Sequence, residues 1–358
     1  MDFIVQDALK QINQTNEDII VGRANIKVIG VGGAGNNMGD WLFHKGVKGA
    51  EIILANTDKA HLDAREADKK LLIGKESTRG LGAGGYLEVG EQAAKESLPE
   101  IKDALKGADM VFVCAGMGGG TGTGASPTVA QVAKEQGAIV IGTVTMPFKI
   151  EGSRIEKAEE GLTKLRRNCD TVIVIDNNRL IEMAGQLPLR QAFGVANELI
   201  STMIKGIVEM ITVPSLVNRD FADIKAVMKG GGVAVIGVGE SDSENKVEES
   251  VKRALLNPLL DVSYEGAQGA LIHITGGPDM TLEDVARAGE MVTSSLDKDA
   301  MVTWGARVQD NMSGKMRIMT IITGVKSPYI LGPGSNSRKS LEEKAAKISD
   351  ELGIQILR

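Results

Sequence analysis

The segment from Gly116 to Gly124, with the sequence GMGGGTGTG, constrains this chain more than any other. It follows an apolar run, residues 110–115, that predicts a buried strand, and it precedes residues 125–134, whose pattern predicts a helix. Glycine lets main-chain N–H groups approach a ligand closely, and a helix N-terminus adds unpaired donors and a positive dipole. The segment therefore predicts a phosphate site. Because it contains no lysine, it differs from the P-loop pattern, and main chain plus a metal ion would hold the phosphate.

A second glycine motif, GVGGAG at residues 30–35, lies between another predicted strand and helix. This is the G-x-G-x-x-G arrangement of dinucleotide sites, and Asp58 lies near the position of the acid that binds an NAD ribose. An NAD-dependent oxidoreductase is therefore one alternative. The second glycine loop argues against it, because such an enzyme does not need GGGTGTG, and no catalytic His or Lys constellation stands out.

Composition excludes several classes of protein. The net charge of −6 argues against a general nucleic-acid-binding protein, which needs a basic face. Cys114 and Cys169 fall in or beside predicted buried strands, so we expect two reduced core cysteines in a cytoplasmic protein. No apolar run approaches the ~18 residues that span a bilayer, and the acidic Asp2 is unlike a signal peptide. We therefore expect no direct membrane insertion.

The order of predicted elements indicates two domains joined by a long helix. Aliphatic strands alternate with helices in residues 25–187, which predicts a doubly wound α/β nucleotide-binding domain with its ligand at the carboxyl ends of the strands. The predicted strands there are 26–32, 51–57, 70–74, 110–116, 138–146 and 171–176, with helices at, for example, 90–106 and 154–167. Residues 188–211 form one apolar helical stripe, typical of a core helix between domains.

The remaining segments complete the expected organisation. Residues 212–332 predict a second, α+β domain with a mixed sheet, whose strands are 233–239, 270–276, 301–308 and 316–325. Residues 1–24 resemble an amphipathic helical extension, and residues 333–358 a linker and tail.

GGGTGTG, together with the run NRDFAD at residues 218–223, resembles the tubulin/FtsZ family of filament-forming GTPases. The resemblance extends from about residue 25 to about residue 326 and is greatest to the prokaryotic cell-division members. It implies GTP and GDP as ligands, Mg²⁺ held mainly by nucleotide and water, and a role in the cytokinetic ring at mid-cell. The N-terminal extension and compact tail favour an archaeal member. A relative that polymerises with slow or no hydrolysis, outside division, is a further alternative.

The resemblance also assigns roles to residues. In this family the loop at Thr78–Gly85 senses the γ-phosphate, which implies that Ala83 and Gly84 are main-chain donors. Arg154 follows Glu151 by three residues where four are usual, and Asn197 stands where many members carry Asp. The residues that the resemblance places at the nucleotide are Gly32, Gly33, Ala34, Gly35, Asn36, Asn56, Ala83, Gly84, Gly116, Gly118, Gly119, Gly120, Thr121, Gly122, Thr123, Gly124, Thr145, Pro147, Glu151, Arg154, Asn177, Phe193 and Asn197.

Asn218, Asp220 and Asp223 are the expected catalytic residues. The two carboxylates are three residues apart at a predicted helix start and share one face, which also suits a plain helix cap. The resemblance implies that this loop acts on the nucleotide of the next subunit. It also implies a cation at the interface between the subunits, which can be a monovalent cation in addition to Mg²⁺. Such a head-to-tail contact is heterologous and generates filaments. It also implies that the tail binds a membrane-anchoring adaptor.

Overall fold

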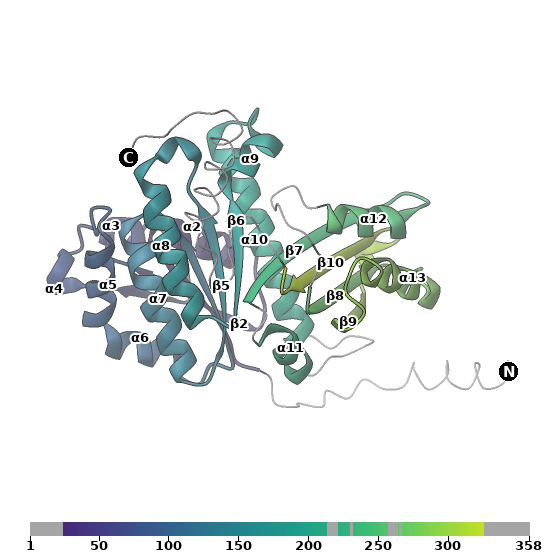
Figure 1. The fold of residues 1–358 in the computed structure, drawn as a ribbon, viewed down its shortest axis with the longest axis horizontal. Helices are drawn as coiled ribbons and strands as arrows, with labels where there is room; N and C mark the ends of the chain where they lie inside the picture. The colour runs from purple at the N-terminus through teal and green to yellow at the C-terminus, as the bar shows by residue number, and fades with distance from the viewer. Residues whose placement is uncertain (1–23, 213–220, 230–231, 257–263, 265–266, 326–358) are drawn as a thin grey trace, which may run out of the picture.

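The computed structural model describes residues 24–212, 221–229, 232–256, 264 and 267–325 (Figure 1). Its strands are β1 (Ile26–Val31), β2 (Ala50–Asn56), β3 (Lys69–Leu72), β4 (Met110–Gly116), β5 (Ile139–Met146), β6 (Thr171–Asp176), β7 (Gly232–Ser241), β8 (Gly269–Gly276), β9 (Met301–Val308) and β10 (Met316–Thr323). Its α-helices are α2 (Gly32–His44), α3 (Lys59–Asp63), α4 (Lys75–Thr78), α5 (Leu87–Glu96), α6 (Leu98–Leu105), α7 (Gly120–Glu135), α8 (Ser153–Asn168), α9 (Asn177–Ala184), α10 (Leu189–Thr212), α11 (Phe221–Met228), α12 (Lys246–Leu255) and α13 (Leu282–Thr293). Short 3₁₀ helices are η1 (Lys149–Glu151) and η2 (Asp310–Met312).

The strands form one mixed sheet in the order β3-β2-β1-β4-β5-β6-β7-β10-β8-β9. Strands β1 to β6 are parallel, whereas β10 is antiparallel to both β7 and β8. The mixed sheet expected in the second half is continuous with the parallel sheet, because Gly232 to Ala234 of β7 pair with the outer edge of β6. This pairing satisfies main-chain groups that an edge strand would leave open, so hydrogen bonding continues between the halves.

Helices cover both faces of the parallel part of the sheet, as a doubly wound fold requires (Figure 1). Apolar side chains of α5 to α8 bury one face, and those of α2, α9 and α10 the other. Helix α10, expected at 188–211, runs between the two halves, and its Ile200, Ile204 and Ile207 share a core with Phe112 of β4 and Ile321 of β10. The long helix therefore connects the packing of both halves.

The single helix expected at 90–106 is wrong: α5 and α6 are separated by Ser97. Pro99, at the start of α6, has no N–H to donate within a continuous helix. The Ser97 hydroxyl accepts a hydrogen bond from the Gly74 amide at 3.0 Å, so the break also anchors the segment after β3. The expected extension 1–24, except for Ala24, and the tail 333–358 lie outside the described residues.

His273 of β8 gives the fold a pH dependence. Burial, with Arg307 nearby, lowers the pKa of His273 from 6.5 to about 4. The unfolded chain therefore takes up a proton that the folded chain resists, so this stability is complete above pH 6.5 and is lost as pH falls towards 4. We expect a loss of about 3 kcal/mol across that window. Urea unfolding at several pH values measures it.

His273→Gln should flatten this pH dependence. The matched control is His44→Gln: the pKa of exposed His44 is raised by its bond to the Asp40 carbonyl and by the carboxylates of Asp40 and Glu66, which gives the opposite sign. An unchanged slope between pH 6.5 and 4 in His273→Gln would contradict the assignment.

Candidate functional site

The loops that the sequence analysis identified meet at the carboxyl ends of the parallel strands, which form one side of the sheet, here called its carboxyl edge. Because β1 to β6 are parallel, the segments that follow them all lie at their carboxyl ends. These segments are the start of α2, residues 56–58, residues 78–85, residues 116–124, residues 145–154 and the start of α9. The structure therefore gathers nearly all of the predicted nucleotide-binding residues along this edge.

Two long helices begin here without the usual neutralising groups. Helix α2 starts at Gly32 and α7 at Gly120; neither has a side-chain cap or an acidic residue in its first turn. By contrast, α13 carries a capping box of Thr281 and Asp284. The first amides of α2 and α7 are thus left as donors at a positive dipole end, the arrangement that binds phosphate.

The two glycine loops touch one another. A Cβ placed on Gly32, whose φ is +72°, would lie 2.6 Å from the Gly122 amide nitrogen. The hydroxyls of Thr57 and Thr121 are hydrogen-bonded at 2.6 Å, which ties the loop after β2 to the start of α7. Gly33 and Ala34 are exposed beside them. The loops form one continuous surface rather than two separate sites.

Asn36 and Asn56 lie beneath this surface. The fully buried Asn36 amide donates to the Gly30 carbonyl at 2.8 Å and to the Ala55 carbonyl at 3.2 Å. Its own oxygen accepts a 2.7 Å bond from the Asn56 amide. Both side chains therefore connect β1 to β2 and fix the loops above them, with their polar atoms directed into the protein.

The loop at Thr78–Gly85, the predicted γ-phosphate loop, is held against neighbouring segments by main-chain hydrogen bonds. The Lys59 amide donates to the Gly80 carbonyl at 3.0 Å, and the Gly82 amide to the Thr57 carbonyl at 3.1 Å. Lys157 of α8 donates to the Gly85 carbonyl at 2.9 Å. Ala83 is buried and Gly84 exposed, so Gly84 is the more accessible of the two predicted donors.

The segment after β5 carries the next predicted residues. Thr145 and Pro147 are buried at the strand end. Glu151 and Arg154 form an ion pair at 2.7 Å, and the second Glu151 oxygen accepts from the Phe148 amide at 2.8 Å. At the spacing of three residues found in this chain, these two predicted residues contact one another.

Asn177, Phe193 and Asn197 lie at the far end of the row of loops. Asn177 is the half-buried first residue of α9. Phe193 is 40% exposed and packs edge-to-face on Phe148, with 5.9 Å between ring centroids. Asn197 lies one turn further along α10, half-buried. An exposed aromatic ring and amide side chains are groups that can contact a base.

Asp223, one of the predicted catalytic carboxylates, is separated from these loops. Asp223 is in the first turn of α11, and Asn218 and Asp220 lie outside the described residues. Thr171, at the amino end of β6, donates to the Met228 carbonyl of α11 at 2.7 Å. Helix α11 thus lies at the amino ends of the strands, here called the amino edge of the sheet (Figure 1). The six residues of β6 separate the two ends of that strand by about 20 Å.

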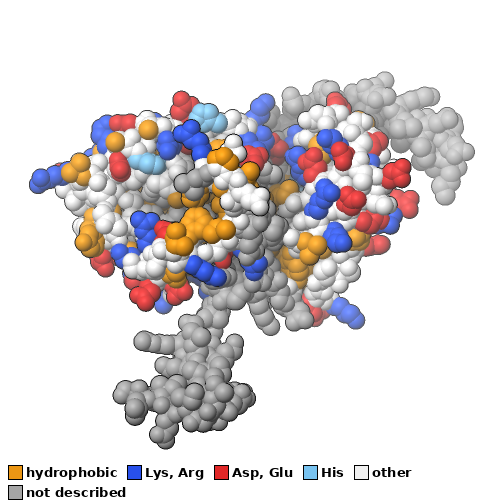
Figure 2. Space-filling view, turned by 90° about the horizontal axis from the view of Figure 1, so that it is seen from above, with side chains coloured by type: hydrophobic (Ala, Val, Ile, Leu, Met, Phe, Trp, Pro, Cys, Tyr) orange, Lys and Arg blue, Asp and Glu red, His pale blue; other side chains and the backbone are white. Residues whose placement is uncertain are grey.

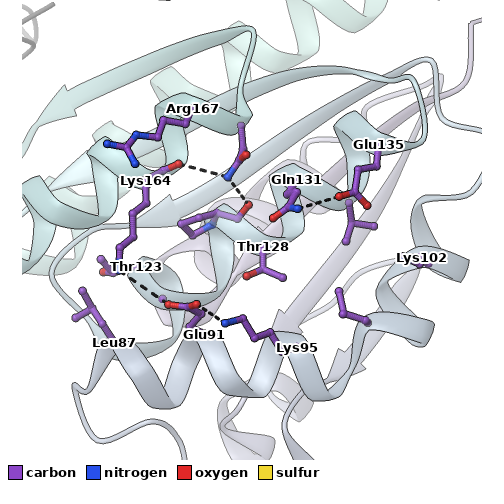
Figure 3. A pocket seen from close by; sticks show the side chains of 15 residues that line it. Leu87, Glu91, Lys95, Lys102, Thr123, Thr128, Gln131, Glu135, Lys164 and Arg167 are labelled. Atoms are coloured by element: carbon purple, nitrogen blue, oxygen red, sulfur yellow. Dashed lines mark hydrogen bonds and ion pairs between the residues drawn. The ribbon is translucent and has the colours of Figure 1, made fainter. Parts of the chain in front are cut away.

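A cavity lies away from most of the row of loops. A groove of about 670 Å³ lies between α5, α7 and α8, on the face of the sheet that α5 to α8 cover (Figure 3). Thr123 lies on its floor, and its hydroxyl accepts from the Gly118 amide at 2.8 Å. Thr123 and Gly124, the last two residues of the predicted phosphate segment, therefore line this groove.

Some side chains at the site were not identified from the sequence. Lys157 had no signal in the sequence, because the loop it contacts is 72 residues away. Asp176 and Asn178 did have a signal in the sequence, because an acid just before a helix is an N-cap pattern.

Both cysteines are free and buried, and burial raises the pKa of Cys114 and of Cys169 to about 12, which excludes a reactive thiol. In the described part of the chain, no three His, Cys, Asp or Glu side chains are grouped to hold a metal ion.

Exposed apolar side chains lie among charged and other side chains on this side of the molecule (Figure 2). Leu81, Tyr86, Ile150 and Ile181 are 54–90% exposed in segments that follow the strand ends. Large exposed apolar patches mark contact surfaces. No helix in the described ranges is long and apolar enough to cross a bilayer.

Comparison with known proteins gives this arrangement a family. The GTPase-domain model of the Tubulin/FtsZ family matches residues 25–185, and the FtsZ C-terminal domain model matches residues 232–326. Cell division protein FtsZ 2 of Methanocaldococcus jannaschii is 55% identical over 94% of this chain and 90% of its own length. FtsZ 2 of Halobacterium salinarum is 49% identical over 99% of this chain and 93% of its own. The solved structure of an empty FtsZ dimer from M. jannaschii is similar, with a TM-score of 0.80 and 45% identity over 93% of this chain and 98% of that one.

Proposed function

This chain belongs to the tubulin/FtsZ family, and from that premise we propose which of its residues bind GTP and how two subunits hydrolyse it. Membership makes it a GTP-binding, GTP-hydrolysing cell-division protein that self-assembles. It also removes the oxidoreductase alternative, since the matching domain is a GTPase domain.

One observation carries the proposed site: α2 and α7 begin with uncapped glycine turns that touch at the carboxyl edge of the sheet. In our proposal their amides hold the phosphates, and Ala83 and Gly84 contact the γ-phosphate. Glu151 and Arg154 contact the ribose and phosphates, while Asn177, Phe193 and Asn197 contact guanine. In the same proposal, Mg²⁺ is held mainly by the phosphates and water.

The site of hydrolysis is proposed to form between subunits. Asp223 lies a strand length from the loops, so it does not reach the nucleotide of its own chain. Stacking the amino edge of one subunit on the carboxyl edge of the next brings Asn218, Asp220 and Asp223 to the γ-phosphate. There the two carboxylates orient and polarise the attacking water, and Mg²⁺, with a monovalent cation at the interface, offsets their repulsion from the phosphates.

The test is phosphate release from GTP with Mg²⁺, as activity per molecule against protein concentration, with pelleting alongside. A shared site requires activity that rises above a critical concentration, together with GTP-dependent pelleting. Activity independent of concentration would mean a self-contained site. Pelleting without turnover would instead indicate the relative that polymerises but does not hydrolyse.

Ile150→Asp should weaken assembly without weakening GTP binding. Ile150 is 90% exposed at the proposed interface, and burying an isoleucine contributes about 1.5–3 kcal/mol. We expect the critical concentration to rise about tenfold or more. Light scattering and a fluorescent-nucleotide titration measure the two properties.

Two controls isolate the interface. Ile150→Leu keeps an apolar surface and should assemble normally. Leu256→Asp changes a leucine that is 65% exposed beside α12 in the second half, and should also assemble normally. Equal defects in Ile150→Asp and Leu256→Asp would place the interface elsewhere.

Two finer proposals extend the assembly. Residues 333–358 end in an apolar stretch, GIQIL at 353–357, which we propose as the peptide that a membrane-anchoring adaptor binds. We also propose that the filaments lie in the cytoplasm at mid-cell, in the division ring.

A further inference from the structure

A buried carboxylate lies at the end of β6, next to the proposed guanine contact Asn177. Asp176 is 7% exposed and pairs in register with Met146, the last residue of β5. Its Oδ1 accepts two hydrogen bonds from Asn178, from the amide nitrogen at 2.8 Å and from Nδ2 at 2.7 Å. Its buried Oδ2 has no hydrogen-bond partner among the described residues. Since a buried carboxylate is costly without hydrogen bonds, its bonds to Asn178 are its main compensation.

Asn178 also connects Asp176 to the segment that follows β5. Its side-chain oxygen accepts from the Lys149 amide at 2.9 Å, at the first residue of η1. Both ends of the Asn178 amide are therefore occupied, which fixes its orientation. The same turn contains Glu151, which accepts from the Phe148 amide and pairs with Arg154.

A plain helix cap would not need this arrangement. Capping α9 requires only one acceptor for a main-chain N–H, which Ser, Thr or Asn also supplies. The second bond, to Asn178 Nδ2, serves instead to turn the Asn178 oxygen towards η1. The carboxylate thus connects two segments that are separated by the whole of α8 in the sequence.

We propose that Asp176 is a positioning residue for the nucleoside half of the GTP site. Through Asn178 it fixes both the start of α9, with Asn177 for the base, and the turn that carries Glu151 for the ribose. It does not itself touch the nucleotide. This inference rests on the proposed function. The phosphate loops are held by other contacts, such as Thr57 to Thr121, so their grip on the phosphates is independent of Asp176.

The test compares dissociation constants of Asp176→Ala and the unaltered full chain for four nucleotides. ITP lacks the guanine 2-amino group, 3′-deoxy-GTP lacks a ribose hydroxyl, and GDP lacks the γ-phosphate. We expect GTP binding to weaken about tenfold, with a much smaller loss for ITP and 3′-deoxy-GTP, so that the preference for GTP over each shrinks. The ratio of GTP to GDP affinity should stay unchanged. Asn178→Ala should change the four dissociation constants as Asp176→Ala does. Asp176→Asn, which keeps the Oδ1 acceptor, should retain most of the preference for GTP over ITP and 3′-deoxy-GTP.

Asp170→Ala is the matched control. Asp170 precedes β6 at its other end and accepts from the Val140 amide at 2.9 Å, so its loss should lower stability without altering nucleotide preference. If Asp176→Ala and Asn178→Ala weakened all four nucleotides by one factor, Asp176 would be merely structural and the proposal would fail. Failure of the unaltered chain to bind GTP would instead overturn the proposed function.

Discussion

Asp220→Ala should leave GTP binding intact and lower turnover by about 100-fold or more. Loss of a group that stabilises or orients the reacting atoms has an effect of this size, and phosphoryl transfer depends mainly on such positioning. Asp220 immediately precedes α11 in the sequence, and α11 lies at the amino ends of the strands, whereas every proposed phosphate contact lies at their carboxyl ends. The affinity of a subunit for its own nucleotide should therefore not depend on Asp220.

Mixing two inactive variants separates action between subunits from action within one. Asp220→Ala keeps an intact nucleotide site, and Gly118→Ala, with its phosphate loop displaced, keeps an intact Asp220. If the site is shared, the mixture should recover turnover at interfaces that combine the two intact parts. A chain with both substitutions, mixed with Asp220→Ala, is the control and should recover none. Unreduced turnover in Asp220→Ala would refute the interface mechanism.

The fold was largely predictable because its parallel strands are continuous aliphatic runs punctuated by glycine. Strand β4 and helix α10 fall at the predicted positions to within one residue, since few other structures suit those patterns. The break at Ser97 was missed because the apolar period continues through it, although Pro99 marked the place. The pairing of β7 with β6 is a tertiary event with no local signal.

The site was predictable where chemistry is carried by the main chain of a glycine loop. It was less so where side chains far apart in sequence cooperate. The resemblance predicts that Asn36 and Asn56 lie at the nucleotide, whereas their hydrogen bonds show that they support the loops from below. The bridge from Asp176 through Asn178 to Lys149 depends on strand register, because β5 and β6 must end side by side.

Gly118→Ala should lower kcat/KM for GTP by on the order of 100-fold, because a displacement of about 1 Å in groups that position a substrate has that effect. Gly118 has a φ of +93°, and a Cβ there would lie 2.9 Å from the Arg154 carbonyl oxygen. Since that oxygen is fixed in the first turn of α8, the loop must move away. Its amide also donates to Thr123 Oγ1 at 2.8 Å, so the movement reaches the start of α7. Steady-state turnover with varied GTP measures it.

Gly137→Ala separates the clash from backbone strain. Gly137 follows α7 at its other end, has a similar φ of +88°, and has open space where the Cβ would be. Alanine there should cost about 1–2 kcal/mol of stability through positive φ alone, with kcat/KM unchanged. If the two variants lost activity equally, strain transmitted along α7 would explain the defect. Loss confined to Gly118→Ala would show that the close approach of this loop to α8 sets the position of the phosphate donors.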